Sequence, residues 1–182
     1  ILTEFETDCP AIAGDQSQIH QILVNLCSNA LEAMKEKGGL LRISVKRVWP
    51  DADFTQKFPE MEMGPLVGLR VGDTGVGMGE AAVERIFEPF YTTKTATGGT
   101  GLGLAVVHGI VKSHHGAISV RSQLGHGTVF DLFFPVLNES SNPGSTVKSE
   151  LRHGDGERIL LVDDEASVLR AVSELLDRLG YR

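Results

Sequence analysis

Three glycine clusters constrain the fold of this 182-residue chain more than any other feature. One follows a predicted strand at Asp73-Thr74-Gly75-Val76-Gly77-Met78-Gly79, one opens a predicted helix over 98–104, and one lies in a predicted hairpin turn over 125–127. Glycine permits tight turns and lets the backbone approach a flat ring or a phosphate closely. The sequence therefore predicts a domain of mixed strands and helices whose connections are unusually tight.

Hydrophobic periodicity divides the chain into these elements. A helix is predicted from Asp15, an N-cap residue with Gln18 three residues on, to a stop at Gly38-Gly39. Another helix is predicted from about Leu102 to a close at Gly116, and a short one over 79–87. Strands are predicted over 2–7, 40–49, 67–72, 117–121 and 128–134. The segment 50–65, which contains three prolines, is predicted to be a surface loop.

The composition is that of a globular protein, with 41% hydrophobic and 23% charged residues. A formal net charge of -7 argues against nucleic acid as the main partner. It does not argue against ATP, because backbone N–H groups and a divalent cation can hold phosphates. The sequence has no apolar run of the roughly 20 residues that a membrane helix needs. We expect a cytoplasmic location, and an inner-membrane anchor stays open for a longer parent protein.

Two asparagines, Asn25 and Asn29, lie four residues apart and share one face of the first predicted helix. Burying two carboxamides on an apolar helix is costly unless they have partners. A carboxamide oxygen is a hard ligand that suits Mg²⁺. The residues alone leave two interpretations open, a metal site and a pair of satisfied core asparagines.

The first and third glycine clusters carry groups that could recognise adenine. Asp73 ends a predicted strand, and its carboxylate could accept a hydrogen bond from an exocyclic amine. The hydroxyl of Thr128 follows Gly125-His126-Gly127 and could reach the ring through water. Ordinary turns explain both clusters equally well.

The second glycine cluster and the aromatic segment before it suggest a phosphate site. Free N–H groups at the start of a helix bind phosphate well, although the cluster lacks the Gly-Lys-Ser/Thr of a Walker A loop. Phe87 and Phe90 could anchor a mobile lid in which Lys94 meets phosphate. A flexible hinge and a hydrophobic patch that closes the core are the alternatives.

Taken in order, these segments resemble the sequence boxes of histidine kinases. The matching segments are Asn25-Leu26-x-x-Asn29-Ala30 (N box), Asp73-x-Gly75-x-Gly77 (first glycine box), Phe87-Glu88-Pro89-Phe90 (F box), Gly99-Thr100-Gly101-Leu102-Gly103-Leu104 (second glycine box) and Gly125-x-Gly127-Thr128 (third glycine box). The resemblance covers about 15–135. It implies an α/β fold of the Bergerat type, a two-layer ATP-binding sandwich with helices on one face of a mixed sheet, over residues 1–137.

The resemblance also implies roles for individual residues. It implies a catalytic part for Asn25, Asn29 and Lys94, with Mg²⁺ held by Asn29 and helped by Asn25. The residues implied to bind ATP are Asn29, Asp73, Gly75, Gly77, Phe87, Phe90, Gly99, Thr100, Gly101, Leu102, Gly103 and Thr128.

Asn25 bears on the choice between a kinase and an ATPase. ATPases with the same fold place a glutamate one turn before the metal-binding asparagine, to activate water. An amide cannot act as a general base at neutral pH. The resemblance therefore favours a kinase that transfers phosphate to a histidine in an upstream dimerisation domain of a homodimeric parent. An ATP-binding regulatory module without transferase activity and a related ATPase are the alternatives.

The end of the chain has a different character. Residues 138–157 are polar and are expected to form a linker. The segment Ile159-Leu160-Leu161-Val162-Asp163-Asp164-Glu165 resembles the first strand of a response-regulator receiver, and 166–179 has the pattern of a helix. The resemblance implies an incomplete receiver βα unit over 158–182, present in cis, in which Asp163 and Asp164 would bind Mg²⁺ once the domain is complete.

Overall fold

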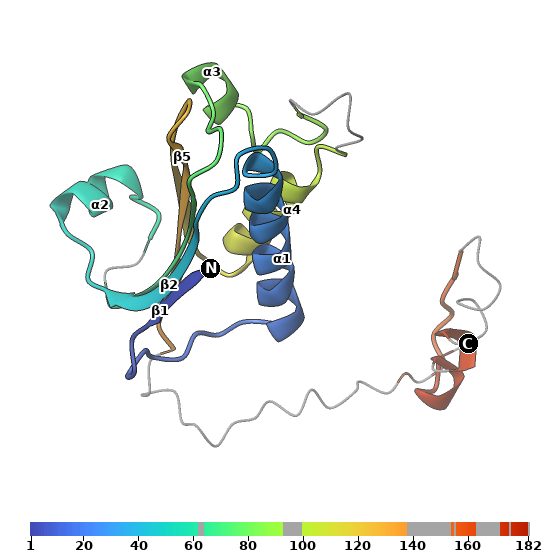
Figure 1. The fold of residues 1–182 in the computed structure, drawn as a ribbon. Helices are drawn as coiled ribbons and strands as arrows, with labels where there is room; N and C mark the ends of the chain where they lie inside the picture. Colours follow the sequence, from blue (N-terminus) through green and yellow to red (C-terminus); the bar gives the residue numbers. More distant parts are fainter. Residues whose placement is uncertain are drawn as a thin grey trace. The chain divides into compact units, whose positions relative to one another are not determined.

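The described part of the chain contains a mixed sheet of five strands in the order β1-β2-β3-β5-β4 (Figure 1). The strands are β1 (Leu2–Phe5), β2 (Leu41–Val48), β3 (Leu66–Asp73), β4 (Ala117–Gln123) and β5 (Gly127–Pro135). β1 is parallel to β2, and the other neighbours are antiparallel. The computed structural model describes residues 1–61, 64–92, 100–137, 154, 156–162, 172–174 and 176–181. All five predicted strands are confirmed, with ends within two residues of those expected.

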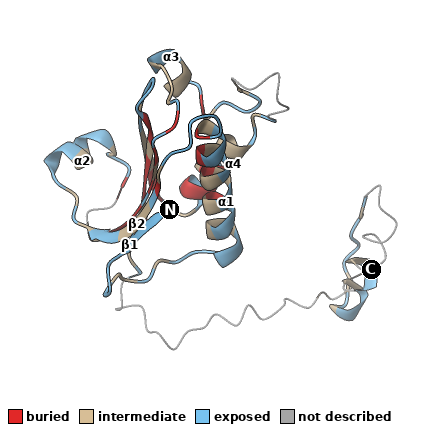
Figure 2. Ribbon diagram, viewed as in Figure 1, coloured by how far each residue is buried: buried red, intermediate tan, exposed pale blue. Residues whose placement is uncertain are grey.

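Two long helices, α1 (Gln16–Ala33) and α4 (Gly103–Ser113), cover one face of this sheet (Figure 1). The buried core lies between the helices and the alternate strand residues that point toward them, as Figure 2 shows. Ile22 and Val107 are fully buried at its centre, against Val71 and Leu132 of the sheet. Burial of each such side chain stabilises the fold by roughly 1.5–3 kcal/mol. The predicted two-layer α/β sandwich is therefore confirmed.

The caps of these helices explain where they begin and end. Asp15 caps α1 as predicted, because its Oδ1 accepts hydrogen bonds from the N–H groups of Ser17 (2.7 Å) and Gln18 (3.4 Å). The expected end at Gly38-Gly39 is wrong, since α1 ends at Ala33. The carbonyl of Ala33 accepts instead from the N–H of Val76 in the first glycine cluster (3.1 Å).

One imidazole joins the start of α1 to the end of α4. The Nε2 atom of His114 accepts a hydrogen bond from the N–H of Asp15 (3.2 Å), and Nδ1 lies 2.8 Å from the carbonyl oxygen of Ile110. Because a carbonyl can only accept, Nδ1 carries the proton in this geometry. The close of this helix also differs from expectation: His115, at φ +54°, takes the left-handed position, and Gly116 follows as a buried residue.

The predicted loop over 50–65 is wrong in part, because it contains α2 (Ala52–Lys57). Asp51 caps this helix by accepting from the N–H of Phe54 (2.8 Å). Phe54 and Phe58 pack on Phe133 of β5, with ring centroids 4.9 and 6.1 Å away. These residues form a second apolar cluster on the sheet face opposite α1 and α4, so helices do not lie on one face alone (Figure 1).

The chain divides into two units, Ile1–Asn138 and Glu139–Arg182. In the second unit, residues 172–174 and 176–178 are helical, within the helix expected there. The strand expected over 158–162 is absent from the described residues, and Leu160 is 89% exposed. A strand needs a neighbour for its backbone hydrogen bonds, and the described residues of this unit supply none. In the part of the chain that the structure describes, no helix is both long and apolar enough to span a bilayer.

Candidate nucleotide-binding site

The start of α4 lies directly beside the two-asparagine helix. A Cβ atom built on Gly103 would lie 3.2 Å from Oδ1 of Asn25, a tight contact that glycine avoids. No side chain caps the first turn of α4, where Leu102 stands at the N-cap. Its N–H groups therefore stay available for an anion. The structure thus brings Asn25 and the second glycine cluster together, as the sequence predicted; Asn29 follows one turn along α1, half-buried like Asn25.

The loop before α4 is hydrogen-bonded to the aromatic segment that contains Phe87 and Phe90. Gly101 has φ +65°, and its carbonyl accepts a hydrogen bond from the N–H of Phe90 (3.0 Å). A Cβ atom on Gly101 would overlap the backbone of Phe90. Phe90 itself takes the left-handed conformation (φ +67°), which is costly for a bulky residue, and its ring is 74% exposed. Gly101 is therefore required here for both its conformation and its lack of a side chain.

Asp73 is a buried carboxylate at the end of β3. Its Oδ1 accepts a hydrogen bond from the N–H of Gly75 (2.8 Å), and it pairs with Thr128 across the β3–β5 ladder. Burial raises the pKa of Asp73 above its ordinary value, while hydrogen bonds from the backbone of Gly75 and Thr128 limit the rise. The carboxylate thus accepts from two backbone N–H groups, and its two oxygens keep capacity for a further hydrogen bond from a ligand.

The first and third glycine clusters pack on each other. Gly77, at φ +65°, lies so close to β4 that a Cβ atom would overlap the carbonyl of Gln123. The N–H of Gly125 donates to the carbonyl of Val76 (2.7 Å). Gly75 has a similar reason to lack a side chain, since a Cβ atom there would lie 2.7 Å from the backbone of Ala33. The turn after Asp73 is therefore held between the end of α1 and the β4–β5 hairpin.

Ser122 is a site residue that sequence reasoning missed. Its Oγ accepts a hydrogen bond from the N–H of Met78 (2.8 Å) and lies 2.8 Å from Oγ1 of Thr128. Ser122 therefore links the first glycine cluster to the hydroxyl of Thr128, which was predicted to lie near adenine. Thr128 is only 5% exposed. The available signal was its inward position in β4, two residues after Val120, where an apolar residue was due.

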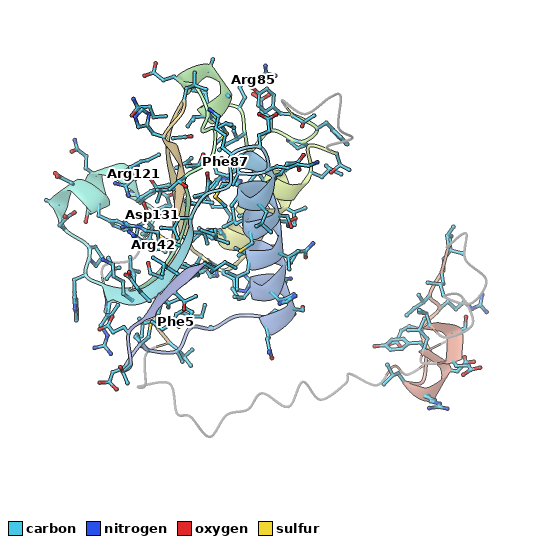
Figure 3. The ribbon with its side chains drawn as sticks, viewed as in Figure 1. Phe5, Arg42, Arg85, Phe87, Arg121 and Asp131 are labelled. Carbon is cyan, nitrogen blue, oxygen red and sulfur yellow. The ribbon has the colours of Figure 1, made fainter. Side chains whose placement is uncertain are left out.

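The two aromatic residues of the F box have different surroundings. Phe87 packs on His108 of α4, with ring centroids 5.1 Å apart, and contacts the main core (Figure 3). Arg85 lies 4.5 Å from the centroid of the Tyr91 ring and forms an ion pair with Glu88. Phe87 thus closes the core, and Phe90 presents its ring to solvent beside Gly101.

Four residues that the sequence singled out, Lys94, Gly99, Asp163 and Asp164, lie outside the described residues. Within the described ranges, no group of three or more His, Cys, Asp or Glu side chains is placed to hold a metal ion. Along α1, Asn25 contacts the start of α4 and Ala33 contacts the turn after Asp73. At 1.5 Å per residue these two points are about 12 Å apart. α1 thus runs along one side of the site. It extends from the start of α4, which suits phosphates, to the turn that carries the Asp73 carboxylate, which suits a nucleotide base.

Comparison with known proteins agrees with this geometry. Residues 14–138 match the family model described as "Histidine kinase-, DNA gyrase B-, and HSP90-like ATPase". "Sensor kinase CckA" of Brucella abortus (strain 2308) is 35% identical over 179 residues, covering 93% of this chain and 19% of its own length. "Sensor histidine kinase ZraS" of Escherichia coli (strain K12) is 38% identical over 134 residues, covering 74% of this chain and 25% of its own length. This chain therefore spans only about a fifth to a quarter of these relatives.

A solved structure shares the fold. The nucleotide-free catalytic domain of histidine kinase ThkA superposes with a TM-score of 0.56 at 30% identity, over 74% of this chain and 77% of that one. The match of the family model to residues 14–138 covers the sheet from β2 onward and both long helices. The chain therefore belongs to the family of histidine kinase-, DNA gyrase B- and HSP90-like ATPases, and the nucleotide for which its site is built is ATP.

Proposed function

We propose that this domain is the catalytic part of a histidine protein kinase, which transfers the γ-phosphate of ATP to a histidine of a helical domain in the same longer protein. The observation that carries the proposal is Asn25, whose carboxamide oxygen borders the start of α4. A hydrolase of this family would need a general base one turn before Asn29, and an amide cannot serve as one. The site would hold ATP without activating water, so that an external nucleophile takes the phosphate.

In this proposal some residues of the site contact the adenine base of ATP and others contact its phosphates. The Asp73 carboxylate accepts from the adenine amine with its remaining hydrogen-bond capacity, and Thr128 with Ser122 lines the same end. Gly99, Thr100, Gly101, Leu102 and Gly103 form the phosphate loop, whose N–H groups at the start of α4 neutralise charge. Lys94 adds a cation from the preceding segment. Phosphoryl transfer depends mostly on positioning and on charge neutralisation, so these groups suffice without a base.

Mg²⁺ fits the donors at the phosphate end. Asn29 and Asn25 offer carboxamide oxygens one turn apart, and Mg²⁺ keeps several waters while taking few protein ligands. The absence of a carboxylate cluster in the described ranges suits a cation that arrives with ATP rather than one held by the empty protein. Asn29 and Asn25 would hold the ion, which would supply positive charge to offset that of the phosphates.

The partners follow from the chemistry. A kinase of this kind needs a histidine, and each of the six histidines here lies in a helix, turn or linker without a motif. We infer that the acceptor belongs to a dimerisation domain of a homodimeric parent in the cytoplasm. Phe90 gives that domain an apolar contact, since its ring is 74% exposed beside the phosphate loop. Two relatives of this chain, "Sensor kinase CckA" and "Sensor histidine kinase ZraS", are kinases of this kind by name, which supports the proposal.

We also infer that residues 158–182 begin a receiver domain, preceded by a linker over 138–157. The order of the apolar segment 159–162, the acidic Asp163 and Asp164, and a helix favours it. The alignment with "Sensor kinase CckA" extends over 93% of this chain and so includes part of this region. Asp163 and Asp164 would serve as Mg²⁺ ligands after the remaining strands of the receiver are present.

The kinase proposal is tested with γ-labelled ATP, this chain, and a separately supplied helical domain that carries the phosphoacceptor histidine of a histidine kinase. Label is expected on that domain and not on a variant whose histidine is replaced by glutamine. ATP binding without transfer to any such domain would contradict the proposal and favour a regulatory module. Release of inorganic phosphate at a rate independent of the acceptor would indicate an ATPase instead.

A further inference from the structure

The sheet face opposite α1 and α4 has an apolar half and a charged half. The apolar half lies under α2, around Phe133. In the charged half, β2 and β4 contribute Arg42 and Arg121, which share one row across the sheet with Gly72 and Val129. Arg70 and Asp131 lie opposite each other in the next row. Glu4 of β1 lies in the same row as Arg70 and Asp131, beside Ser44. Three arginines and two carboxylates therefore leave one net positive charge on this half, in a chain whose formal net charge is -7.

Asp131 holds two of these arginines in place. It is 7% exposed, its Oδ1 lies 2.5 Å from Nε of Arg70, and its Oδ2 lies 2.8 Å from a terminal nitrogen of Arg121. Each guanidinium has five N–H donors and spends one of them on this carboxylate in the hydrogen bonds described. Both arginine side chains stay partly exposed, at 44% and 63%. Their remaining donors are therefore oriented in advance and face solvent.

A cavity of about 310 Å³ opens between these side chains. Its lining consists of Leu40, Arg42, Arg70, Gly72, Asp73, Thr74, Arg121, His126 and Val129, so it extends to the end of β3 that carries Asp73. A Cβ atom on Gly72 would meet only Val129, at 3.4 Å, and a backbone oxygen at 3.8 Å, so the space above this glycine is open. Figure 3 labels Arg42, Arg121 and Asp131 along this side of the sheet. The cavity thus combines an apolar floor with cationic walls and one carboxylate, that of Asp73, at its edge.

The spacing of the cations suits one small anion. β2 and β4 are three strand intervals apart, which places the Cα atoms of Arg42 and Arg121 about 14 Å from each other. The side chains of Arg42 and Arg121 both line the cavity in this gap. No ion pair is described for Arg42 in the residues that the structure covers. A planar guanidinium binds carboxylate and phosphate oxygens in pairs, so an oxyanion above Gly72 can be held from both sides.

We propose that this pocket, on the sheet face opposite α1 and α4 and bordered by Asp73 at the end of β3, binds a small organic oxyanion, a phosphate or carboxylate carried on an apolar body. The apolar body would rest on Val129 and Gly72, and the oxyanion would meet Arg42 and Arg121. The volume lies in the range of small-molecule sites, which begins at roughly 300 Å³. A pocket of that size and concavity favours a small ligand over a flat protein surface. Occupancy would link β3, which ends at Asp73, to a second ligand.

The test uses the whole chain, saturated with a non-hydrolysable ATP analogue so that probes cannot enter the ATP site. Phenyl phosphate, benzoate and inorganic phosphate are titrated while backbone and arginine Nε–H resonances are recorded by NMR. Phenyl phosphate or benzoate is expected to shift the resonances of Gly72, Val129 and Arg121, and the stronger of the two identifies the oxyanion. Inorganic phosphate, which lacks the apolar body, is expected to bind at least about fivefold more weakly.

Two variants that each lose one positive charge test whether the probe binds in this cavity. Arg42→Gln is expected to weaken the better probe at least about fivefold, because it removes one wall without touching the Asp131 pairs. Lys46→Gln removes the same charge from the same strand and face, outside the cavity lining, and is expected to leave binding unchanged. Gly72→Val, which would fill the floor, is expected to abolish binding while the fold persists.

Three results would overturn the proposal. The first is no shift at Gly72, Val129 or Arg121 with any probe at millimolar concentration. The second is equal weakening by Arg42→Gln and Lys46→Gln, which would reflect general electrostatic attraction. The third is binding of an acidic peptide at this face without binding of either small probe, which would make the face a protein-docking surface.

Discussion

Asp73→Asn separates nucleotide recognition from folding, because the structure fixes how the new amide must sit. The N–H of Gly75 points at Oδ1 of Asp73 at 2.8 Å, so the amide oxygen of an asparagine has to remain there. The NH₂ group then occupies the position of the second carboxylate oxygen. In the proposed binding mode the adenine amine meets the Asp73 carboxylate at this position, so a donor would replace an acceptor opposite the amine.

The size of the effect follows from this change. A hydrogen bond to a charged acceptor contributes about 1.5–3 kcal/mol, and two opposed donors add a further penalty. We expect a loss of about 2–4 kcal/mol in ATP binding free energy, which corresponds to about 30- to 700-fold weaker affinity. Calorimetric titration of both proteins with ATP and Mg²⁺ measures it directly.

In contrast to ATP affinity, the free energy of unfolding is not expected to fall in the Asp73→Asn variant. Burial raises the pKa of Asp73 in the folded chain, so the ionised carboxylate costs stability at neutral pH. That cost disappears as the pH falls through the raised pKa, since the folded state then takes up the proton more readily than the unfolded state. Asp73→Asn lacks the cost at every pH. The variant is therefore expected to be at least as stable as the parent at pH 7, with the difference narrowing on acidification.

The assay combines calorimetry with urea unfolding at several pH values. In the parent protein, ATP affinity should also fall on acidification, starting at a higher pH than for an ordinary aspartate. Unchanged ATP affinity in the variant would refute the adenine assignment. Reduced affinity together with a large loss of stability would refute the argument that the amide fits the same turn.

Three further changes test other parts of the structure. Asn25→Glu supplies the missing base and is expected to raise ATP hydrolysis, measured as phosphate release; a flat rate in a variant that still binds ATP would contradict the base argument. Gly77→Ala is expected to cost more than about 2 kcal/mol in urea unfolding, because a Cβ atom overlaps a neighbouring carbonyl. Gly38→Ala is its control, since Gly38 has nearly the same φ but open space around it, and equal losses would rule out the steric explanation. Phe54→Ala is expected to cost about 1–3 kcal/mol through loss of the α2 contact without altering ATP affinity; weaker ATP binding would show that α2 supports the site.

The sequence predicted most of the fold because its patterns are local. Short apolar runs, in part alternating, and the glycine turn over 125–127 identified all five strands, and the cap at Asp15 identified the start of α1. The end of α1 could not be predicted, since the carbonyl of Ala33 bonds to Val76, which is 43 residues away in the chain. α2 was missed because prolines surround it, although Asp51 and the four-residue spacing of Phe54 and Phe58 were signals of a capped, amphipathic helix.

The site, like the fold, has features that the sequence predicted and features that it did not. Asn25 and the glycine cluster before α4 were expected together, and the structure places Gly103 against Asn25. Ser122 and Asp131 were missed because their partners lie on neighbouring strands. Cross-strand register decides which side chains face each other, and a single sequence does not state it.

The imidazole of His114 has a consequence for how the domain opens. It fastens α1 to α4 at the end distant from Asn25, whereas the first turn of α4 carries no side-chain cap. Amide hydrogens should therefore exchange with solvent along a gradient, slowly at Asp15 and near Ile110 and fast at Gly103 and Leu104. ATP would protect the fast-exchanging amides at the start of α4 and so reduce the difference in exchange rate along the helices. The two helices would then be held together at the His114 end with or without nucleotide, and at the Gly103 end only when nucleotide is bound.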